Sequence, residues 1–357
     1  MKIIHTSDVH IDSPLTARLP AGKVRERRAE LSAGFKRLIG EAERLGVDAV
    51  IIAGDLFDTD RISKRALTSA IDVIGASSGI TFYYLEGNHE KNAIRESGIP
   101  LPNNLKIFEE NWTYFEADNT NIVGRCSIAK GMFESLEMSA EATNIVVLHG
   151  ELRDKTDDEE AIGLQDAKNK NIDYLALGHY HSYSATELPD GGVAVYSGTP
   201  EGRGFDETGE KGFVLINIEN DKVSHTFIPF AKRKLRIIPL DITDATRTSD
   251  IYDMAKNALC EISRDDLIRL ELCGGYSPEL IKDIEGITEK FSDVFYYFEV
   301  KDSSRPQINP DDYKFDKTLK GEFIRTVLSD ETLDEEMKGR IISCGINALM
   351  GEELFEE

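Results

Sequence analysis

The hydrophobic positions of the first 230 or so residues alternate between short apolar runs and longer amphipathic stretches. Strand-like runs occur in KIIHTSD, VDAVIIAGD and ITFYYLEGN, and apolar residues recur at helical spacing over 25–45 and 62–77. The strand-like runs are apolar on both faces, as in a sheet that is covered on both sides. This pattern predicts a βαβαβ arrangement whose strands end in polar clusters.

Five further strand-like runs follow in the same region: NIVVLHG, YLALGHYH, VAVYSGTP, GFVLINIE and KVSHTFIPF. Few helical stretches separate them, so we expect a second sheet packed on the first. The predicted fold class is therefore α/β, a two-sheet α/β sandwich that forms a domain over 1–231.

A different pattern begins after the basic stretch Lys232-Arg233-Lys234. Strands are predicted over 235–241, 267–272 and 294–300, with helices over 247–263 and 278–291, which gives a small βαβαβ domain at 235–301. A linker, KDSSRPQINPDD, comes next. Apolar residues then recur at helical spacing, which predicts a C-terminal helical pair at 312–352, joined near Ser329-Asp330.

The charge balance restricts the partners of the chain. Lys and Arg number 42 against 65 Asp and Glu, a net charge of -23 that disfavours tight, self-sufficient nucleic-acid binding. The four cysteines are scattered without a CxxC pair, which indicates free thiols in a reducing compartment. We find no signal-peptide pattern and no apolar run long enough for a bilayer, so we expect a cytoplasmic protein without a membrane partner.

Five polar clusters end apolar runs: Asp8-Val9-His10, Gly54-Asp55, Gly87-Asn88-His89-Glu90, His149-Gly150 and Gly178-His179-Tyr180-His181. Ligand sites of open α/β sheets lie at the carboxyl ends of the strands. Mixed imidazole and carboxylate ligands suit divalent transition ions, Mn above all, with Mg, Fe or Zn as alternatives. Because a pair of such ions binds a phosphodiester and activates a water, the clusters indicate phosphoester hydrolysis.

A single cluster of this kind has an ordinary structural explanation, since a strand-end Asp is usually a cap or turn residue and a lone His a satisfied polar group. Five clusters in order, each at the end of an apolar run, are not explained in that way. The candidate metal ligands are Asp8, His10, Asp55, Asn88, His149, His179 and His181. His225, in the alternating run KVSHTFIPF, is interpreted as structural.

The motifs DVH, GDLFD, GNHE, HG and GHYH resemble the five motifs of calcineurin-like metallophosphoesterases, in the same order, across residues 1 to about 230. Within that superfamily, TSDVHIDSP, AGDLFDTD and SGTPEGRGFDETGEKG are similar to SbcD-type DNA repair exonucleases, above all to their short bacterial relatives of the YhaO type. The resemblance implies that the domain at 235–301 is a capping domain.

Matched motif by motif, the resemblance also implies roles for single residues. One divalent ion is expected to bind Asp8, His10, Asp55 and His181, and the other Asp55, Asn88, His149 and His179, so that Asp55 bridges them. His89 is expected to be catalytic: its imidazole would face the scissile phosphate and stabilise the transition state or protonate the leaving oxygen.

Three further residues near the motifs have two interpretations each. Asp58 stands where archaeal and eukaryotic nucleases of this family carry His; it either orients a metal ligand from behind or is an acidic turn residue. Arg61 and Arg203 are candidate phosphate contacts, and the alternative is that they are solvated surface charges.

The resemblance favours DNA as the substrate, because a small cyclic nucleotide would need neither a capping domain nor terminal helices. A phosphatase is disfavoured, since Thr59 and Asp60 follow Asp58 where phosphatases carry an Arg. A scaffold that retains metals without activity is the third alternative. The expected partner is an SbcC-like coiled-coil ATPase gripped by the terminal helices, unless these dock on their own catalytic domain; a homodimer is left open.

Overall fold

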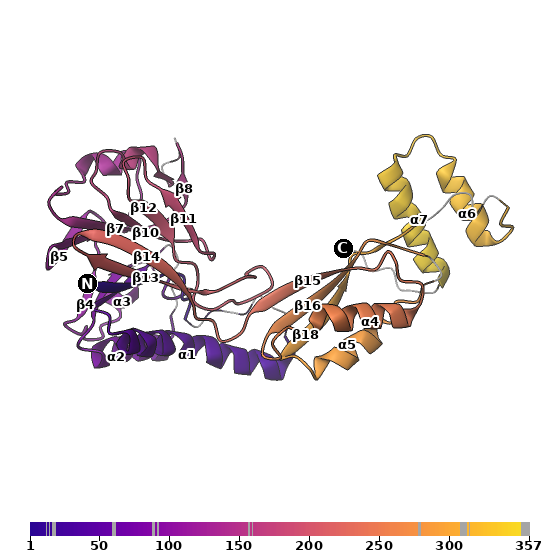
Figure 1. Ribbon diagram of the computed structural model, residues 1–357, viewed down its shortest axis with the longest axis horizontal. Helices are drawn as coiled ribbons and strands as arrows, with labels where there is room; N and C mark the ends of the chain where they lie inside the picture. Colours follow the sequence, from indigo (N-terminus) through magenta and orange to yellow (C-terminus); the bar gives the residue numbers. More distant parts are fainter. Residues whose placement is uncertain are drawn as a thin grey trace. The chain divides into compact units, whose positions relative to one another are not determined.

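The computed structural model describes residues 1–11, 13, 15, 19–58, 62–87, 90, 93–155, 158, 160–277, 280–307, 313 and 315–350. The chain divides into two compact units, Met1–Lys234 and Leu235–Glu357 (Figure 1). Among the helices described, none is both long and apolar enough to cross a membrane.

The first unit contains three α-helices and fourteen strands among its described residues: β1 (Lys2–Thr6), α1 (Ala21–Leu45), β2 (Ala49–Ala53), α2 (Lys64–Ala76), β3 (Thr81–Leu85), α3 (Ala93–Glu96), β4 (Leu105–Ile107), β5 (Thr113–Ala117), β6 (Thr120–Gly124), β7 (Thr143–His149), β8 (Leu152–Arg153), β9 (Ile162–Gly163), β10 (Tyr174–Gly178), β11 (Ser184–Glu187), β12 (Val193–Tyr196), β13 (Gly212–Glu219) and β14 (Lys222–Pro229).

The first sheet has the order β14-β13-β1-β2-β3-β4, with β1 to β4 parallel. Successive side chains of a strand point to opposite faces, which is why its strands are apolar throughout. Ile52 packs on one face with Phe35 and Leu38 of α1 and Ile71 of α2. Its neighbour Ile51 packs on the other face, against the second sheet. The helices α1 and α2 thus cover one side of this sheet (Figure 1).

The second sheet has the order β11-β12-β10-β7-β6-β5, in which β6, β7, β10 and β12 are parallel. Val147 and Ala176 face the first sheet, whereas Val146 and Leu175 face an outer layer that includes Phe133. The first unit is therefore a two-sheet α/β sandwich, which confirms the predicted fold class.

Two strands that we expected in the second sheet belong to the first. GFVLINIE (β13) pairs antiparallel with β1, and KVSHTFIPF (β14) pairs antiparallel with β13. Both runs are strands as predicted, but the sheet to which we assigned them was wrong. The parallel strands β1 to β4 are added in one direction, so the other edge of β1 remains open for β13.

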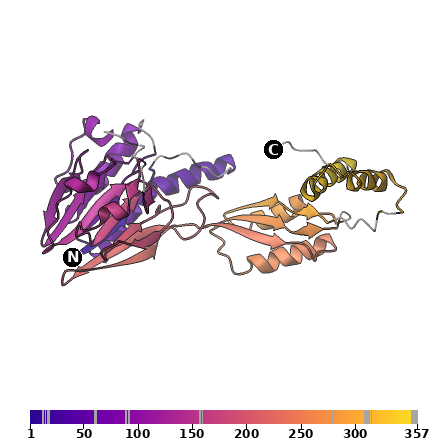
Figure 2. The same cartoon turned by 90° about the horizontal axis from the view of Figure 1, so that it is seen from above.

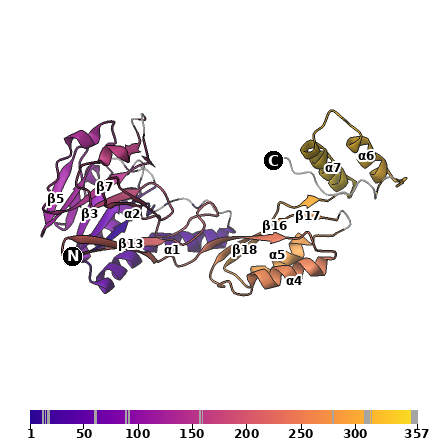
Figure 3. The same cartoon turned by 45° about the horizontal axis from the view of Figure 1, so that its top comes forward.

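The second unit contains β15 (Leu235–Asp241), α4 (Thr248–Leu259), β16 (Leu267–Cys273), β17 (Gly275–Tyr276), α5 (Ile284–Ser292), β18 (Tyr297–Asp302), β19 (Arg305–Pro306), α6 (Leu319–Leu328) and α7 (Glu335–Met350). Strands β15, β16 and β18 form a parallel sheet, and α4 and α5 lie on the same face of it (Figure 3). Helix α5 begins later than predicted because Asp283 caps it, accepting a hydrogen bond from the Gly286 N–H.

The two terminal helices pack side by side, as Figure 2 shows. Their shared core contains Ile324 and Val327 of α6 with Ile342 and Ile346 of α7. Thr318 caps α6 by accepting a hydrogen bond from the Gly321 N–H at 3.2 Å.

Candidate metal centre

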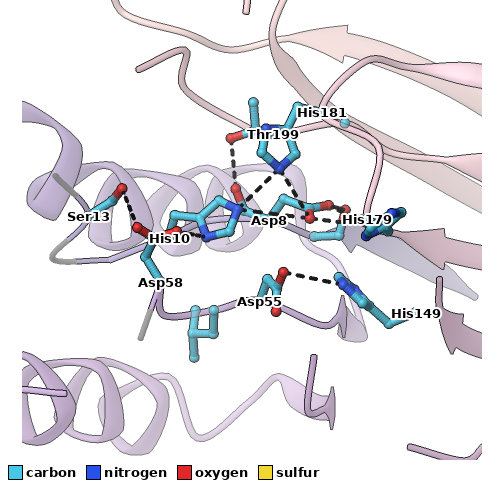
Figure 4. Close-up of polar contacts among 12 residues, drawn as sticks. Asp8, His10, Ser13, Asp55, Asp58, His149, His179, His181 and Thr199 are labelled. Atoms are coloured by element: carbon cyan, nitrogen blue, oxygen red, sulfur yellow. Dashed lines mark hydrogen bonds and ion pairs between the residues drawn. The ribbon is translucent and has the colours of Figure 1, made fainter. Parts of the chain in front are cut away.

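Asp8 follows β1 and is fully buried at the meeting point of the two sheets (Figure 4). Its carboxylate accepts hydrogen bonds from the Ser7 hydroxyl and from the backbone N–H of His179, which lies 3.1 and 3.2 Å from the two oxygens. The Thr199 hydroxyl donates to its main-chain oxygen at 2.7 Å. Groups from both sheets therefore fix the position of this carboxylate.

Asp8, His10 and His181 form the first group of candidate ligands, with one ligand atom of each within 4.8 Å of the others. The Nε2 atoms of the two histidines are 3.2 Å apart, and they lie 4.0 and 3.6 Å from Asp8 Oδ1 (Figure 4). Two nitrogens that each bind one ion at about 2.1 Å are about 3 to 3.4 Å apart in common geometries. The donor set thus fits a shared divalent ion.

Asp8, Asp55 and His149 form the second group. His149 Nε2 lies 3.3 Å from Asp55 Oδ2, while Nδ1 donates to the Ala53 carbonyl oxygen at 2.9 Å. Because Nδ1 carries the proton, Nε2 is the nitrogen that offers a lone pair to an ion. Among the residues placed by the structure, the two groups share Asp8.

Of the other predicted site residues, the structure places His179 beside the second group. The ring centroid of His179 is 5.7 Å from that of His149, and His179 is exposed at the end of β10. Asn88, His89 and Arg61 lie outside the described residues, so their roles stay predictions.

The backbone at this site adopts conformations that side-chain-bearing residues seldom take. The φ angles of Asp8, His10 and Asp55 are 50°, 51° and 51°, and that of His179 is 109°. Outside the site, the described non-glycine residues with positive φ are all Asp or Asn. Strain of about 1–3 kcal/mol per residue persists where the surrounding structure enforces it, and it clusters at functional sites.

Three glycines precede predicted ligands, and each stands where a side chain would collide with the site. A Cβ on Gly54 would lie 2.1 Å from His149 Nδ1, one on Gly87 would lie 1.9 Å from Asp55 Oδ1, and one on Gly178 would lie 1.9 Å from the Ala53 carbonyl oxygen. The glycine in the GD, GNH and GHYH motifs therefore lets the strand ends approach closely enough for the ligands to converge.

The electrostatics of the site favour an added positive charge. Burial alone would lower the pKa of His149, but the Asp55 hydrogen bond and the charges of Asp8 and Asp55 raise it to about 9. Two buried carboxylates with oxygens within 4.8 Å of one imidazole nitrogen leave excess negative charge, which a proton or a cation offsets.

Glu90 shapes the turn that carries Asp55. Its carboxylate is fully buried and accepts hydrogen bonds from the backbone N–H groups of Leu56 (2.9 Å) and Phe57 (2.6 Å). Burial and the charge of Asp55 raise the pKa of Glu90 to about 8, against the effect of these two backbone hydrogen bonds. The last residue of the GNHE motif is thus a buried support.

The structure also places a polar network behind the first group. His10 Nδ1 lies 3.0 Å from Asp58 Oδ1, and His181 Nδ1 lies 2.7 Å from Glu207 Oε1. The Arg203 guanidinium contacts both carboxylates, and its exposed fraction is 12%. The predicted phosphate contact of Arg203 stays a prediction.

Glu207 was not identified from the sequence, because it lies in a loop that does not follow an apolar strand-like run. The signal available in the sequence was its spacing of four residues from Arg203.

Comparison with known proteins agrees with this geometry. The sequence profile of the family described as calcineurin-like phosphoesterase matches residues 1–200. The uncharacterized metallophosphoesterase YhaO of Bacillus subtilis is 26% identical over 312 residues, which cover 82% of this chain and 76% of that protein.

Two relatives have names that refer to DNA cleavage or repair. A component of the nuclease SbcCD from Staphylococcus saprophyticus is 25% identical over 291 residues, 69% of this chain and 73% of that protein. The DNA double-strand break repair protein Mre11 of Methanopyrus kandleri is 27% identical over 251 residues, 61% of this chain, and the match spans little more than half (54%) of that protein. The family profile matches more than half of the chain, and both candidate ligand groups lie within the matched residues. The chain therefore belongs to the calcineurin-like phosphoesterase family.

Proposed function

We propose that this chain is a two-metal phosphodiesterase that cleaves DNA, of the SbcD type. The observation that carries the proposal is the convergence of two ligand groups on one buried carboxylate: Asp8 with His10 and His181, and Asp8 with Asp55 and His149. The relatives named as a component of the nuclease SbcCD and as an Mre11 repair protein support DNA as the substrate.

The proposed ligands divide into two sets. We assign Asp8, His10, Asp55 and His181 to one ion and Asp55, Asn88, His149 and His179 to the other, so that Asp55 belongs to both sets. The Asp8 carboxylate, which both observed groups share, lies between them. Bound divalent ions, Mn in preference, would lower the pKa of a shared water and neutralise charge on the phosphate. Ser7, Thr199 and Glu90 hold the ligand-bearing strand ends in place. His89 would face the scissile phosphate and stabilise the transition state or protonate the leaving oxygen.

A partner accounts for DNA binding by an acidic chain. At a net charge of -23 the protein repels a polyanion, so a basic surface must come from elsewhere. We propose an SbcC-like ATPase as its source, with the terminal helices α6 and α7 as its contact. Domains at 1–231 and 235–301 would then act as nuclease and capping domain. The isolated chain should bind duplex DNA weakly and cleave it slowly.

The test is an activity panel with Mn or Mg. The purified chain is incubated with linear duplex DNA, single-stranded DNA, a cyclic nucleotide and bis-p-nitrophenyl phosphate. Cleavage of DNA that is absent in D55A supports the proposal. Turnover of the small substrates alone would show a small-molecule phosphodiesterase, and no turnover of any substrate would indicate a scaffold.

The role of His89 has a separate test. H89A should keep its metal content and lose turnover, because the imidazole acts on the substrate and not on the ions. Metal content is measured on the same preparation by elemental analysis. Loss of metal together with activity would make His89 a ligand and contradict the assigned role.

A further inference from the structure

The two histidines of the first ligand group are each held from behind by a carboxylate. His181 Nδ1 donates to Glu207 Oε1 at 2.7 Å, and His10 Nδ1 lies 3.0 Å from Asp58 Oδ1. In both rings Nε2 is the atom that points toward Asp8. A carboxylate on one ring nitrogen fixes the tautomer, orients the ring and makes the other nitrogen a stronger ligand.

Arg203 joins the two carboxylates. Its Nε and Nη2 lie 3.0 and 2.8 Å from Glu207 Oε1, and its Nη1 lies 3.0 Å from Asp58 Oδ1. Nη2 is also 3.3 Å from His181 Nδ1. The two nitrogens lie close together because both donate to Glu207 Oε1. Ser13 completes the network, since its hydroxyl donates to Asp58 Oδ2 at 2.9 Å and accepts from Arg203 at 3.0 Å.

The network is shielded from water. The exposed fractions of the Asp58, Arg203 and Glu207 side chains are 16%, 12% and 5%. Besides His181 and the Arg203 guanidinium, the Arg203 backbone N–H donates to Glu207 Oε2 at 2.7 Å, so both oxygens of this carboxylate are held. Ion pairs held this far from solvent are geometrically defined, unlike surface pairs.

One loop, between β12 and β13, supplies most of these supports. Besides Arg203 and Glu207, the loop contains Thr199, whose hydroxyl donates to the Asp8 main-chain oxygen. It also contains Lys211, whose Nζ donates to the His181 carbonyl oxygen at 2.6 Å. The second group is supported differently: His149 Nδ1 donates to the Ala53 main-chain carbonyl, within the sheets. The histidines of the two ligand groups therefore depend on different parts of the fold, although both groups include Asp8.

We propose that Asp58, Arg203 and Glu207 form a positioning unit that selectively sets the affinity of the ion held by His10 and His181. The inference rests on the proposed ligand set. Arg203 is then a positioning residue, held away from the substrate by its two carboxylates. Loss of the unit frees both rings to rotate and weakens one ion, while the ion at His149 keeps its affinity.

The test is a Mn²⁺ titration of the full chain, with free ion followed by electron paramagnetic resonance. Wild type should bind two equivalents. R203M and E207A should raise the dissociation constant of one equivalent about 10- to 100-fold and leave the other unchanged. E207Q, which still accepts the His181 hydrogen bond, should recover part of the loss.

A buried arginine elsewhere in the same unit provides the control. Arg125 is 9% exposed, and its guanidinium stacks 5.6 Å from the Trp112 ring centroid, on no predicted ligand. R125M should lower thermal stability without changing either Mn²⁺ equivalent. If R203M does not fold, E207Q and D58N preserve side-chain shape and make the same comparison, each expected to weaken the same single equivalent.

Three results would count against these ideas in distinguishable ways. Unchanged Mn²⁺ affinities in R203M with reduced turnover would make Arg203 a phosphate contact, and equal weakening of both equivalents would remove the selectivity; either overturns the positioning unit. A wild-type chain that binds fewer than two Mn²⁺ would instead refute the two-metal site itself.

Discussion

Gly178 stands where β10 of one sheet touches β2 of the other, and a single added methyl group should disturb the whole centre. In G178A the new Cβ would lie 1.9 Å from the Ala53 carbonyl oxygen, 2.7 Å from His149 Nδ1 and 2.8 Å from Ser7 Cβ. The first of these neighbours is backbone in a central strand, so it cannot rotate away. The two strand ends must move apart.

The size of the effect follows from two contributions. Forcing extra volume into a packed interior costs about 1–3 kcal/mol. Stretching the hydrogen bond from His149 to Ala53 loses about 1 kcal/mol more. The sum, about 2–4 kcal/mol, corresponds to a fall in melting temperature of about 5–15 °C for a unit the size of Met1–Lys234.

The melting of the first unit can be followed by itself. Trp112 is the only tryptophan of the chain, so its fluorescence reports on Met1–Lys234 and not on the second unit. The matched control is G40A, inside α1 near its C-terminal end, where a Cβ meets nothing within 4 Å. That change should stabilise the unit slightly, by about 0.5–1 kcal/mol.

Mn²⁺ binding provides the second readout, because displacement of His149 should weaken the ion that it holds. A G178A protein that melts within about 1 °C of wild type and binds two Mn²⁺ with wild-type affinity would refute the reasoning. The close approach of the strand ends would then not be what brings the ligands together.

Three further predictions concern charge, buried support and metal. Hydrogen bonds from Arg233, Lys232 and Arg27 outweigh burial and lower the pKa of Glu30 to about 2. Since the folded pKa is below the unfolded value, this stabilisation is complete above about pH 5 and is lost toward pH 2; E30Q should lower stability by about 2 kcal/mol at pH 7, after allowing for solvent screening, with the difference vanishing in acid melts. E90Q presents an amide N–H to one of two backbone donors and should cost about 1–3 kcal/mol in denaturant titrations, and a wild-type midpoint would contradict the support role. Wild type should gain about 2.7 kcal/mol at Mn²⁺ a hundredfold above its dissociation constant and lose it on chelation, whereas melts of D8N should not respond to Mn²⁺.

The candidate ligands can be selected from the sequence because the pattern that marks them is local. Each strand-end motif pairs an apolar run with a polar cluster, so Asp8, Asp55, His149 and His181 are visible one motif at a time. Parallel strands then bring their carboxyl ends together without any further signal. The terminal helices and the strand 235–241 are likewise identified from periodicity, which depends on neighbouring residues only.

What the sequence does not predict depends on distant pairings. The strand β13 is recognisable, but its position beside β1 follows from which sheet edge is open, and no residue of GFVLINIE specifies that. Glu207 lies in a loop without periodicity, and its contact with His181 exists only after β10 and the loop are assembled. A contact between residues this far apart in the sequence is identified only from the folded structure.

The positive φ angles of Asp8, His10, Asp55 and His179 set function against stability at the same positions. Glycine at any of the four would relieve backbone strain of about 1–3 kcal/mol while deleting a candidate ligand. Without metal ions to stabilise the folded chain, a selection for heat resistance would therefore favour loss of these ligands. The residues most worth keeping are those that a stability-driven redesign of this chain would replace first.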